Sequence, residues 1–290
     1  MAESGHSGGA HPTSAPPSAP PRRGPPGSVL QRMEKGGIGQ VVAIASGKGG
    51  VGKSTITALI ACELRRRGSS VGILDADITG PSQPKLFGLK GPLMDRGEGI
   101  EPAVTANGIS VISSQFMVED EQTPVIWRGP LVTRLILQFF GGVNWGKLDY
   151  LLIDMPPGTS DVPLTVFQAI PLDGIAFVFT PQELAALIVK KAMNMARDLH
   201  VPLVGAIENL AYVTCPHCGK RVDLFGPGHA EAVAREYGIP LLADLPLDPK
   251  LSPLADAGAV GDYESPELRA LVDGLLAALK ERASGEVTVL

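Results

Sequence analysis

Residues 44–55, with the sequence IASGKGGVGKST, hold the first side chains whose types and spacing suggest chemistry. They match the pattern G-x-x-x-x-G-K-[ST], in which glycines turn backbone N–H groups toward a polyphosphate and a helix N-terminus adds partial positive charge. In this pattern Lys53 reaches the β and γ phosphates, the Ser54 hydroxyl binds Mg²⁺, and Thr55 is a candidate contact of the α-phosphate. A purely structural glycine turn is the alternative. The predicted nucleotide contacts are Gly47, Gly49, Gly50, Val51, Gly52, Lys53, Ser54 and Thr55.

Acidic side chains end two apolar runs further along the chain. LDADITGPS (residues 74–82) contains Asp75 and Asp77, and YLLIDMPPGTSD (residues 150–161) contains Asp154. Ligands of open α/β sheets bind at the carboxyl ends of the strands, so we expect these carboxylates near the phosphates. The predicted roles are water activation for Asp77, support of the magnesium shell for Asp75, and a Walker B contact through water for Asp154. A helix cap or a loop turn is the alternative.

The turn that follows Asp154 is a candidate sensor of the nucleotide. Pro156, Pro157 and Gly158 force a tight loop at this point. Gly158 can bring its backbone N–H toward the γ-phosphate, and the loop would then respond to the presence of that phosphate. A turn that merely ends the strand is the alternative.

A pair of cysteines offers a second kind of chemistry. Cys215 and Cys218 lie in TCPHCGK, where Pro216 and Gly219 favour a knuckle that directs both sulfurs to one side, and we expect His217 to be exposed. Two thiolates complete neither a tetrahedral metal site nor a Cys₄ cluster site, whereas a symmetric dimer would supply four for one [4Fe–4S] cluster or one zinc ion. Chemistry alone does not choose between these two, and a redox dithiol is a third option.

The elements that must position these groups form an alternating pattern. From Gln40 onward, short apolar runs alternate with helical stretches, which is typical of strands buried in a parallel sheet. One helix, STITALIACELRRRGSS, is expected to end at Gly68 and to bury Cys62 as a small core residue. The sequence therefore predicts an α/β fold with a doubly wound, mainly parallel sheet and helices on both faces. The predicted strands are VVAIAS, VGILDAD, ISVISS, DYLLIDM, GIAFVFT and LVGAIENL.

Composition limits the domain organisation and the classes of partner. Residues 1–37 are rich in Pro, Gly, Ser and Ala and are expected to form a disordered tail, and residues 38–290 a single P-loop ATPase domain with the CxxC loop. The net charge of -5 gives no general reason to bind nucleic acid or an anionic membrane. No apolar run approaches membrane-spanning length, and three cysteines suit a reducing compartment, so a cytoplasmic protein is expected.

The second lysine of the phosphate loop carries a resemblance to a known group. GKGGVGKS resembles the loop of the deviant Walker A ATPases, which include the septum-site, plasmid-partition and nitrogenase-reductase families. In that group the extra lysine reaches the nucleotide of the partner chain across a dimer. The resemblance therefore implies that Lys48 acts in trans, as an arginine finger does, while Lys53 serves the nucleotide of its own protomer.

Within that group the chain is most similar to the Mrp/ApbC family of iron-sulfur cluster carriers, from about residue 40 to 250. The family reads Gly-Thr-Gly-Asp where this chain has Ser160 as the third residue, and many bacterial members carry a folded N-terminal domain where this chain has its Pro-rich segment. The resemblance implies that Asn209 contacts the adenine side of the nucleotide. It rests on the segments DADITGPSQPKLFGL, PVIWRGP, LDYLLIDMPPGTSDVPLT, TPQELA, IENLAYVTCPHCG and LFGPG.

The resemblance also implies an activity and a set of partners. The expected function is that of a slow ATPase with bound ATP and Mg²⁺, which holds a [4Fe–4S] cluster on Cys215 and Cys218 at a homodimer interface. It would receive the cluster from an upstream scaffold and transfer it to apo iron-sulfur proteins, without nucleic-acid or membrane partners. The alternative is a partition- or positioning-type ATPase with a structural zinc ion at the cysteine pair.

Overall fold

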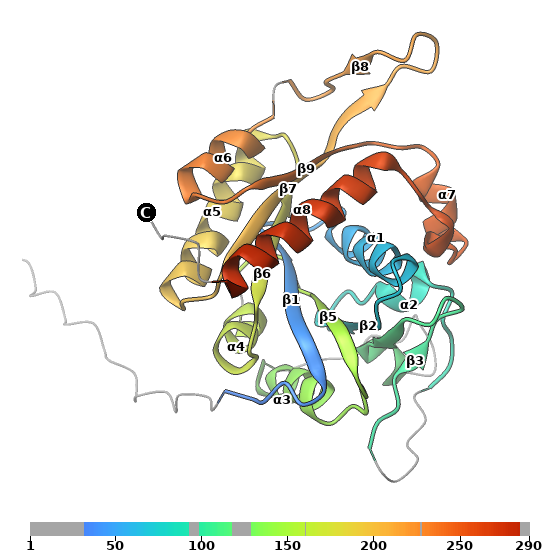
Figure 1. Cartoon of the computed structure of the whole chain (residues 1–290), viewed down its shortest axis with the longest axis vertical. Coiled ribbons are helices and arrows are strands. Elements are labelled where there is room, and N and C mark those ends of the chain that lie inside the picture. Colours follow the sequence, from blue (N-terminus) through green and yellow to red (C-terminus); the bar gives the residue numbers. More distant parts are fainter. Residues whose placement is uncertain (1–31, 93–98, 118–128, 160, 227, 285–290) are drawn as a thin grey trace, which may run out of the picture.

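Strands and helices alternate along the chain, and the computed structural model describes residues 32–92, 99–117, 129–159, 161–226 and 228–284 (Figure 1). In chain order the elements are β1 (Ile38–Ser46), α1 (Lys53–Arg66), β2 (Val71–Asp75), α2 (Gln83–Leu86), β3 (Ala103–Val104), β4 (Ser110–Ile112), η1 (Ser114–Met117), α3 (Gly129–Gly141), β5 (Leu148–Asp154), α4 (Asp161–Ala169), β6 (Gly174–Phe179), α5 (Glu183–Asp198), β7 (Leu203–Thr214), β8 (Arg221–Val222), α6 (Ala230–Tyr237), β9 (Leu241–Pro246), α7 (Leu251–Asp256), η2 (Val260–Asp262) and α8 (Pro266–Ala283).

The strands join into one mainly parallel sheet. Their order is β3-β4-β2-β5-β1-β6-β7-β8, and β9 pairs with β7. Among the described strands only the β3–β4 and β7–β8 pairings are antiparallel. The predicted doubly wound α/β fold is therefore confirmed. The sequence patterns missed β9, as well as the two-residue strands β3 and β8.

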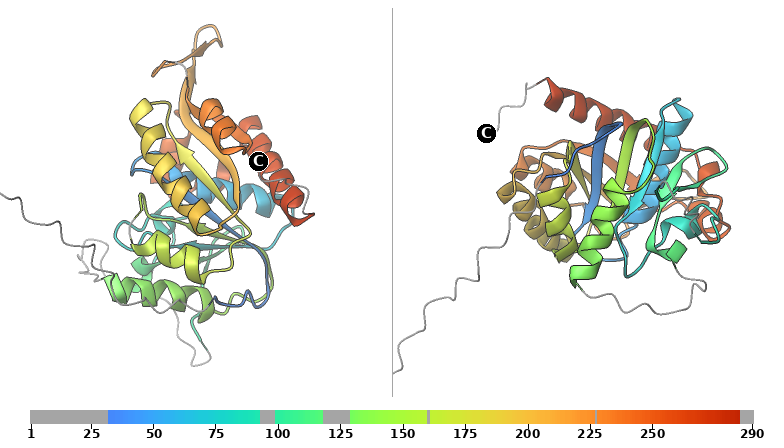
Figure 2. Two further views of the ribbon diagram at one scale, coloured as in Figure 1. Left: turned by 90° about the vertical axis from the view of Figure 1, so that its left-hand side faces the viewer. Right: turned by 90° about the horizontal axis from the view of Figure 1, so that it is seen from below.

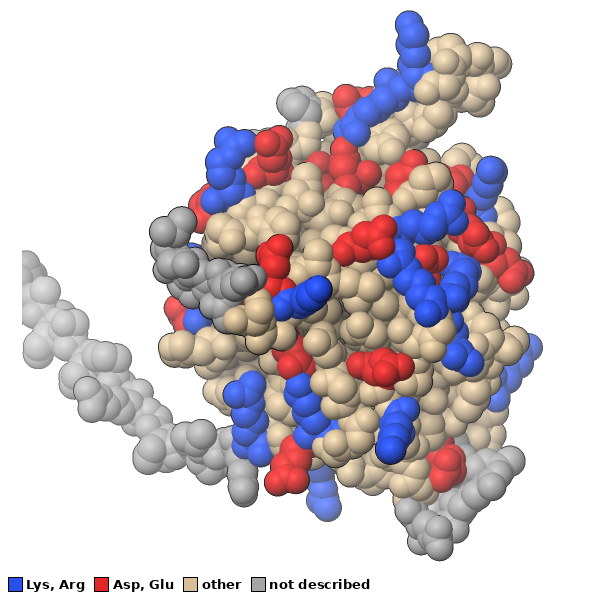
Figure 3. Space-filling model, viewed as in Figure 1, with Lys and Arg blue, Asp and Glu red and all other residues tan. Residues whose placement is uncertain are grey.

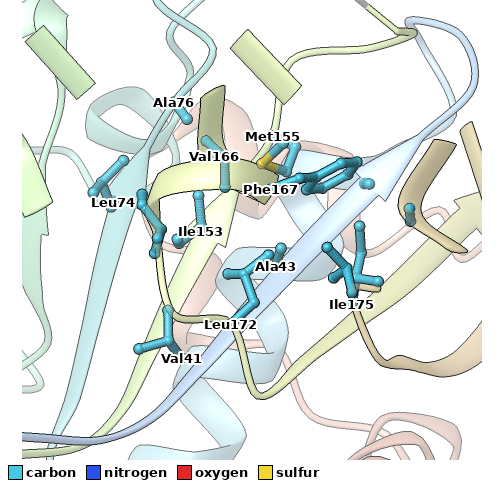
Figure 4. Close-up of a cluster of buried hydrophobic side chains, with 14 of the residues drawn as sticks. Val41, Ala43, Leu74, Ala76, Ile153, Met155, Val166, Phe167, Leu172 and Ile175 are labelled. Carbon is cyan, nitrogen blue, oxygen red and sulfur yellow. The ribbon is translucent and has the colours of Figure 1, made fainter. Parts of the chain in front are cut away.

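Helices cover both faces of the sheet, and this explains why its strands are apolar on both sides. In β1, Val41 and Ala43 point into one cluster, which includes side chains from α3, α4, α5 and α6, while Val42 and Ile44 point into another, with side chains from α1 and α8. Figures 1 and 2 show these two helical layers, and Figure 4 shows part of the first cluster. Successive residues of a strand face opposite sides, so only a continuous apolar run can serve both layers.

The first helix lies as the sequence predicts. Helix α1 ends at Arg66, and Gly68 follows with a positive φ of 90°, a conformation that glycine adopts at little cost. Cys62 is buried within this helix, as expected. The C-terminal amphipathic segment forms α8, whose first turn is capped because the Ser265 hydroxyl accepts a hydrogen bond from the Leu268 N–H at 3.0 Å.

Residues 32–37 lie against the sheet layer, although they belong to the segment expected to be a tail. The Met33 N–H donates to the Ala169 carbonyl at 2.8 Å, and Lys35 Nζ lies 2.5 Å from Asp173 Oδ1. Asp173 also accepts a hydrogen bond from the Val41 N–H at 2.7 Å. Residues 33–37 of the expected tail therefore contact the domain, and the expectation for residues 1–31 lies outside the described residues.

The surface carries charges of both signs. On the face drawn in Figure 3, basic and acidic side chains are interspersed. Some charged side chains of the structure pair directly, as Arg67 does with Glu63 and Asp273 at 2.9 and 2.6 Å. Within the described part of the chain, no helix combines the length and the apolar character needed to cross a bilayer.

Candidate functional site

The phosphate loop lies at the carboxyl edge of the sheet, between β1 and α1. Gly50 and Gly52 have positive φ values of 78° and 83°, which other residues rarely adopt. A Cβ atom at Gly47 would lie 2.6 Å from the backbone nitrogen of Val189 in α5, so only glycine fits at this position. The loop is thus a close-fitting backbone cradle at the start of a helix, which is the geometry that polyphosphate binding requires.

Lys53 and Ser54 lie beside the acid predicted for magnesium. The buried Lys53 ammonium forms an ion pair with Asp154 Oδ1 and a 3.1 Å hydrogen bond with Ser54 Oγ. The structure therefore brings the three predicted phosphate and magnesium groups together. In this arrangement Asp154 and Ser54 together hold the Lys53 ammonium.

Asp154 has a further partner that the sequence patterns did not single out. Gln83, at the start of α2, donates from Nε2 to Asp154 Oδ2 at 2.8 Å and to the Ser54 carbonyl at 3.0 Å. This amide therefore connects the acidic strand end with the phosphate loop. It lies within a quoted family segment, DADITGPSQPKLFGL, but nothing in the pattern gave it a role.

Asp75 is fully buried, one strand away from Asp154 and in register with it. Its carboxylate accepts hydrogen bonds from the backbone of Asp77, Ser82 and Gln83 and from the Ser113 hydroxyl. Burial, together with repulsion from Asp154, raises the pKa of Asp75 to about 8, although these hydrogen bonds oppose the shift. In this arrangement Asp75 fixes the turn that carries Gln83, and its predicted support of the magnesium shell stays a prediction.

Asp77 is half-buried and forms a local turn. Its Oδ1 accepts hydrogen bonds from the Thr79 hydroxyl and the Gly80 N–H, both at 3.2 Å. Burial raises the pKa of this carboxyl, while Lys53 lowers it. The turn contacts match the alternative interpretation of Asp77, and water activation stays a prediction.

Two groups predicted to sense or complete a nucleotide site are held within their own protomer. Lys48 Nζ donates to Gln182 Oε1 at 3.0 Å, and this oxygen also accepts a hydrogen bond from the Thr180 hydroxyl at 2.8 Å. The Gly158 N–H donates to the Ser46 carbonyl at 2.9 Å. Both groups must change partners before Lys48 can reach another protomer or Gly158 a phosphate. Gln182, in the TPQELA segment, is another partner that the sequence patterns did not identify.

Asn209 contacts the phosphate loop directly from β7. Its Nδ2 donates to the Val51 carbonyl at 2.9 Å, and the side chain is buried. The next residue, Leu210, has a positive φ of 58°, which is costly for a residue with a side chain. The expected adenine contact of Asn209 stays a prediction, but its place beside the nucleotide loop is a feature of the structure.

The cysteine pair lies at the tip of a hairpin that continues from β7 and returns through β8. This hairpin projects beyond the body of the sheet (Figures 1 and 2). The Cys215 N–H donates to the Lys220 carbonyl and the Gly219 N–H to the Cys215 carbonyl, each at 2.9 Å, which forms the expected knuckle. Hydrogen bonds from the backbone of His217 and Cys218 lower the pKa of the Cys215 thiol. A thiolate is the metal-binding form, so this geometry favours a metal ligand.

Among the described residues, no third ligand lies beside the two cysteines. Cys215 is partly exposed and Cys218 is exposed. Over the residues that the structure describes, no three or more His, Cys, Asp or Glu side chains gather into a group that could hold a metal ion. Cys62 is not suited to bind a metal ion, because burial raises the pKa of its thiol to about 11 and so disfavours the thiolate.

Charged and aromatic contacts fix the base of the hairpin. Arg221 pairs with Asp223 at 2.6 Å and with Asp244 of β9 at 2.5 Å, and its guanidinium lies 4.1 Å from the ring centroid of Tyr212. After Arg221, the returning segment of the hairpin exposes three large apolar side chains, Val222, Leu224 and Phe225.

Comparisons with known proteins identify the family of the chain. A family model described as NUBPL iron-transfer P-loop NTPase matches residues 37–276. The iron-sulfur cluster carrier protein of Methanocaldococcus jannaschii is 49% identical over 232 residues, which is 79% of each chain. The protein of the same name from Clostridium perfringens is 43% identical over 250 residues, or 83% of this chain and 88% of the relative.

Solved structures give the same result at the level of the fold. The nucleotide-binding protein from Archaeoglobus fulgidus in complex with ADP superimposes with a TM-score of 0.72 at 48% identity and covers 80% of this chain and 91% of its own. The cell division ATPase MinD from Pyrococcus furiosus, at 19% identity, shares the fold with a TM-score of 0.59 over 84% of this chain and 99% of its own. The chain therefore belongs to the NUBPL iron-transfer family of P-loop NTPases, together with the iron-sulfur cluster carrier proteins.

Proposed function

We propose that this protein is an ATP-hydrolysing carrier that holds a [4Fe–4S] cluster between two copies of the chain and transfers it to apo iron-sulfur proteins. The observation that carries the proposal is the exposed cysteine pair, which provides a knuckle and a lowered pKa at Cys215 but no third ligand among the described residues. A two-fold axis through the hairpin tip would bring four thiolates together, the number that a [4Fe–4S] cluster binds.

The exposure of this pair suits a cargo rather than a permanent cofactor. A cluster held at the tip of a projecting hairpin is open to an incoming acceptor thiolate, which can replace Cys215 or Cys218 one ligand at a time. The upstream scaffold would use the same exposed face to deliver the cluster. The exposed apolar side chains of the returning segment, Val222, Leu224 and Phe225, supply area for such contacts.

The glycine cradle, the unpaired Gln83 carbonyl oxygen and the Ser54 hydroxyl fit a magnesium nucleotide. In the proposed site the loop N–H groups bind the phosphates, Ser54 ligates Mg²⁺ and Lys53 moves from Asp154 to the β and γ phosphates. Mg²⁺ supplies charge stabilisation at the phosphate oxygens. Asp77 orients a water molecule for attack on the γ-phosphorus, and Lys48 of the other protomer stabilises the charge that develops on the phosphate oxygens.

Strand β7 connects the two sites. Asn209 contacts the phosphate loop, and the same strand continues into Cys215. Nucleotide binding and cluster binding would therefore both act on β7. The two sites would then be coupled, and each ligand would change the affinity for the other by the same factor.

Anaerobic reconstitution with iron and sulfide tests the cluster. We expect about four iron and four sulfide ions per dimer, as in a single [4Fe–4S] cluster. The cluster should be lost in Cys215→Ser and Cys218→Ser and kept in Cys62→Ala, the matched control, since Cys62 is buried away from the hairpin. Stoichiometric zinc that iron does not replace would contradict the carrier function and make the knuckle structural.

Mixing two inactive variants tests the role of Lys48 in trans. Lys48→Ala and Asp77→Ala should each lose ATPase activity alone. Half of the dimers in an equal mixture contain both chains, and each of these has one complete site, so about a quarter of the wild-type activity should return. If Lys48 served its own nucleotide, the mixture would stay inactive.

A further inference from the structure

Among the described residues of the nucleotide site, two neighbours, Ser82 and Gln83, carry a buried side-chain oxygen without a hydrogen-bond partner, and Gln83 is the fully buried one of the two. Both amide protons of Gln83 are used, toward Asp154 Oδ2 and the Ser54 carbonyl. Its carbonyl oxygen, Oε1, is also buried and has no hydrogen-bond partner among the described residues.

The orientation of this amide follows from its neighbours. An ionised carboxylate and a backbone carbonyl can only accept hydrogen bonds. If the amide were rotated by half a turn, Oε1 would face both of these acceptors, and two hydrogen bonds would be lost. The donors of Gln83 must therefore face Asp154 and Ser54, and the unpaired carbonyl oxygen is a consequence of that arrangement.

A buried acceptor without a donor costs about 1–3 kcal/mol. The amide of Gln83 shares two partners, the Ser54 backbone and Asp154, with the proposed magnesium site. A water molecule bound to Mg²⁺ at that site would be a strong donor. A water of this kind would satisfy Oε1.

From these contacts we infer that Gln83 is a positioning residue of the magnesium site, whose carbonyl oxygen accepts a hydrogen bond from a metal-bound water while its amide group holds Asp154. The inference rests on the proposed nucleotide function. When Lys53 leaves Asp154 for the phosphates, the bond from Gln83 to Oδ2 keeps the carboxylate in place, and Oδ1 becomes free to accept from the metal shell.

The backbone around Gln83 supports this role. The N–H groups of Ser82 and Gln83 donate to Asp75 Oδ2 at 3.1 and 3.3 Å. Asp75 therefore fixes the position of the amide, although it has no direct contact with Ser54. A glutamate in place of Gln83 would add a third carboxylate beside Asp75 and Asp154, which explains why a neutral amide suits the position.

The test is Mn²⁺ binding to the ADP-loaded full-length chain, followed by electron paramagnetic resonance, with Mn²⁺ as the probe of the magnesium site. Gln83→Met keeps the length of the side chain and removes both polar atoms. The expected result is a weakening of Mn²⁺ affinity by about 10–100-fold, as for other groups that orient a metal shell. The affinity for ADP without metal should change by less than about threefold, because both donors of Gln83 are used on protein acceptors, Asp154 and the Ser54 carbonyl.

Gln40 provides a matched control. Its Oε1 is likewise buried and unpaired, but it lies on β1 in register with Tyr150, away from the phosphate loop. Gln40→Met should leave both affinities unchanged. If Gln83→Met does not fold, Gln83→Asn replaces it, since the shorter amide cannot keep all of these contacts and should weaken Mn²⁺ binding in the same selective way.

Two outcomes would overturn the inference. Mn²⁺ affinity within about twofold of the wild type would show that Gln83 does not serve the metal shell. An equal loss of metal-free ADP affinity would show that Gln83 only shapes the loop. Failure of the wild type itself to bind ADP would instead reject the proposed nucleotide function, so the two failures are distinguishable.

Discussion

Alanine substitutions in the phosphate loop test whether Asn209 packs against it as the structure shows. Gly52→Ala places a methyl group in the left-handed conformation, which costs about 1–2 kcal/mol. The new Cβ atom would also lie 2.3 Å from Asn209 Nδ2, so the amide must move and lose its hydrogen bond to the Val51 carbonyl. That bond contributes about 1 kcal/mol, and the total cost should be about 2–3 kcal/mol.

The same loop provides two controls. Gly50→Ala also requires a positive φ, but no atom lies within 4 Å of its new Cβ, so only the backbone cost of about 1–2 kcal/mol applies. Gly49→Ala needs no positive φ, and its nearest neighbour, Pro157 Cγ, would be 3.9 Å away, so its effect should be close to zero.

Urea unfolding of the nucleotide-free variants measures these costs, with unchanged m-values as the condition for comparison. In an Asn209→Ala background the additional cost of Gly52→Ala over Gly50→Ala should disappear, which corresponds to a coupling energy of about 1 kcal/mol. If Gly52→Ala costs no more than Gly50→Ala, or if its excess survives in the Asn209→Ala background, then Asn209 does not pack on the loop.

Three further predictions concern other parts of the molecule. Burial raises the pKa of the Cys62 thiol to about 11, so at pH 8 a thiol reagent should modify the two hairpin cysteines quickly and Cys62 only after unfolding. From pH 9 to 11, unfolding of the chain releases the Cys62 proton, so the stability of the wild type should fall with rising pH relative to that of Cys62→Ala. Arg221→Ala should change global stability by less than about 1 kcal/mol, because its ion pairs are exposed, yet it should speed proteolysis of the hairpin; unchanged cleavage would contradict its anchoring role. Asp173→Ala leaves the Val41 N–H without its acceptor and should cost about 1–3 kcal/mol in urea unfolding, against less than 1 for Lys35→Ala, and equal effects would contradict this reading.

Local patterns were sufficient to predict the fold and the place of the site. The phosphate loop has a fixed length and is followed directly by its helix, so residues 47–54 needed no tertiary information. Asp75 and Asp154 could be placed together because parallel strands end at one edge of a sheet, and the structure puts them in register. The resemblance to cluster carriers was confirmed by the family comparisons.

Contacts between distant segments could not be predicted from one sequence. Gln83 lies in a segment that looks like an ordinary helix start, and only its hydrogen bond to the distant Asp154 shows its place in the site. Lys48 and Gln182 lie 134 residues apart, and no local signal joins them. Strand β9 escaped notice because LLADLP is short and contains an aspartate. Strand β7 was expected to end near residue 210, but it continues to Thr214 through the positive φ of Leu210.

The long separations of the contacts around the phosphate loop have a consequence for folding. Lys53 and its partner Asp154 are 101 residues apart, and Asn209 reaches back over 158 residues to Val51. A chain emerging from the ribosome therefore presents the whole phosphate-loop sequence long before the side chains that support it exist. Such non-local contacts form late and slow the folding reaction. A ligand that binds only the finished loop stabilises only the complete domain, so nucleotide binding would act as a test that the chain has folded through to β7.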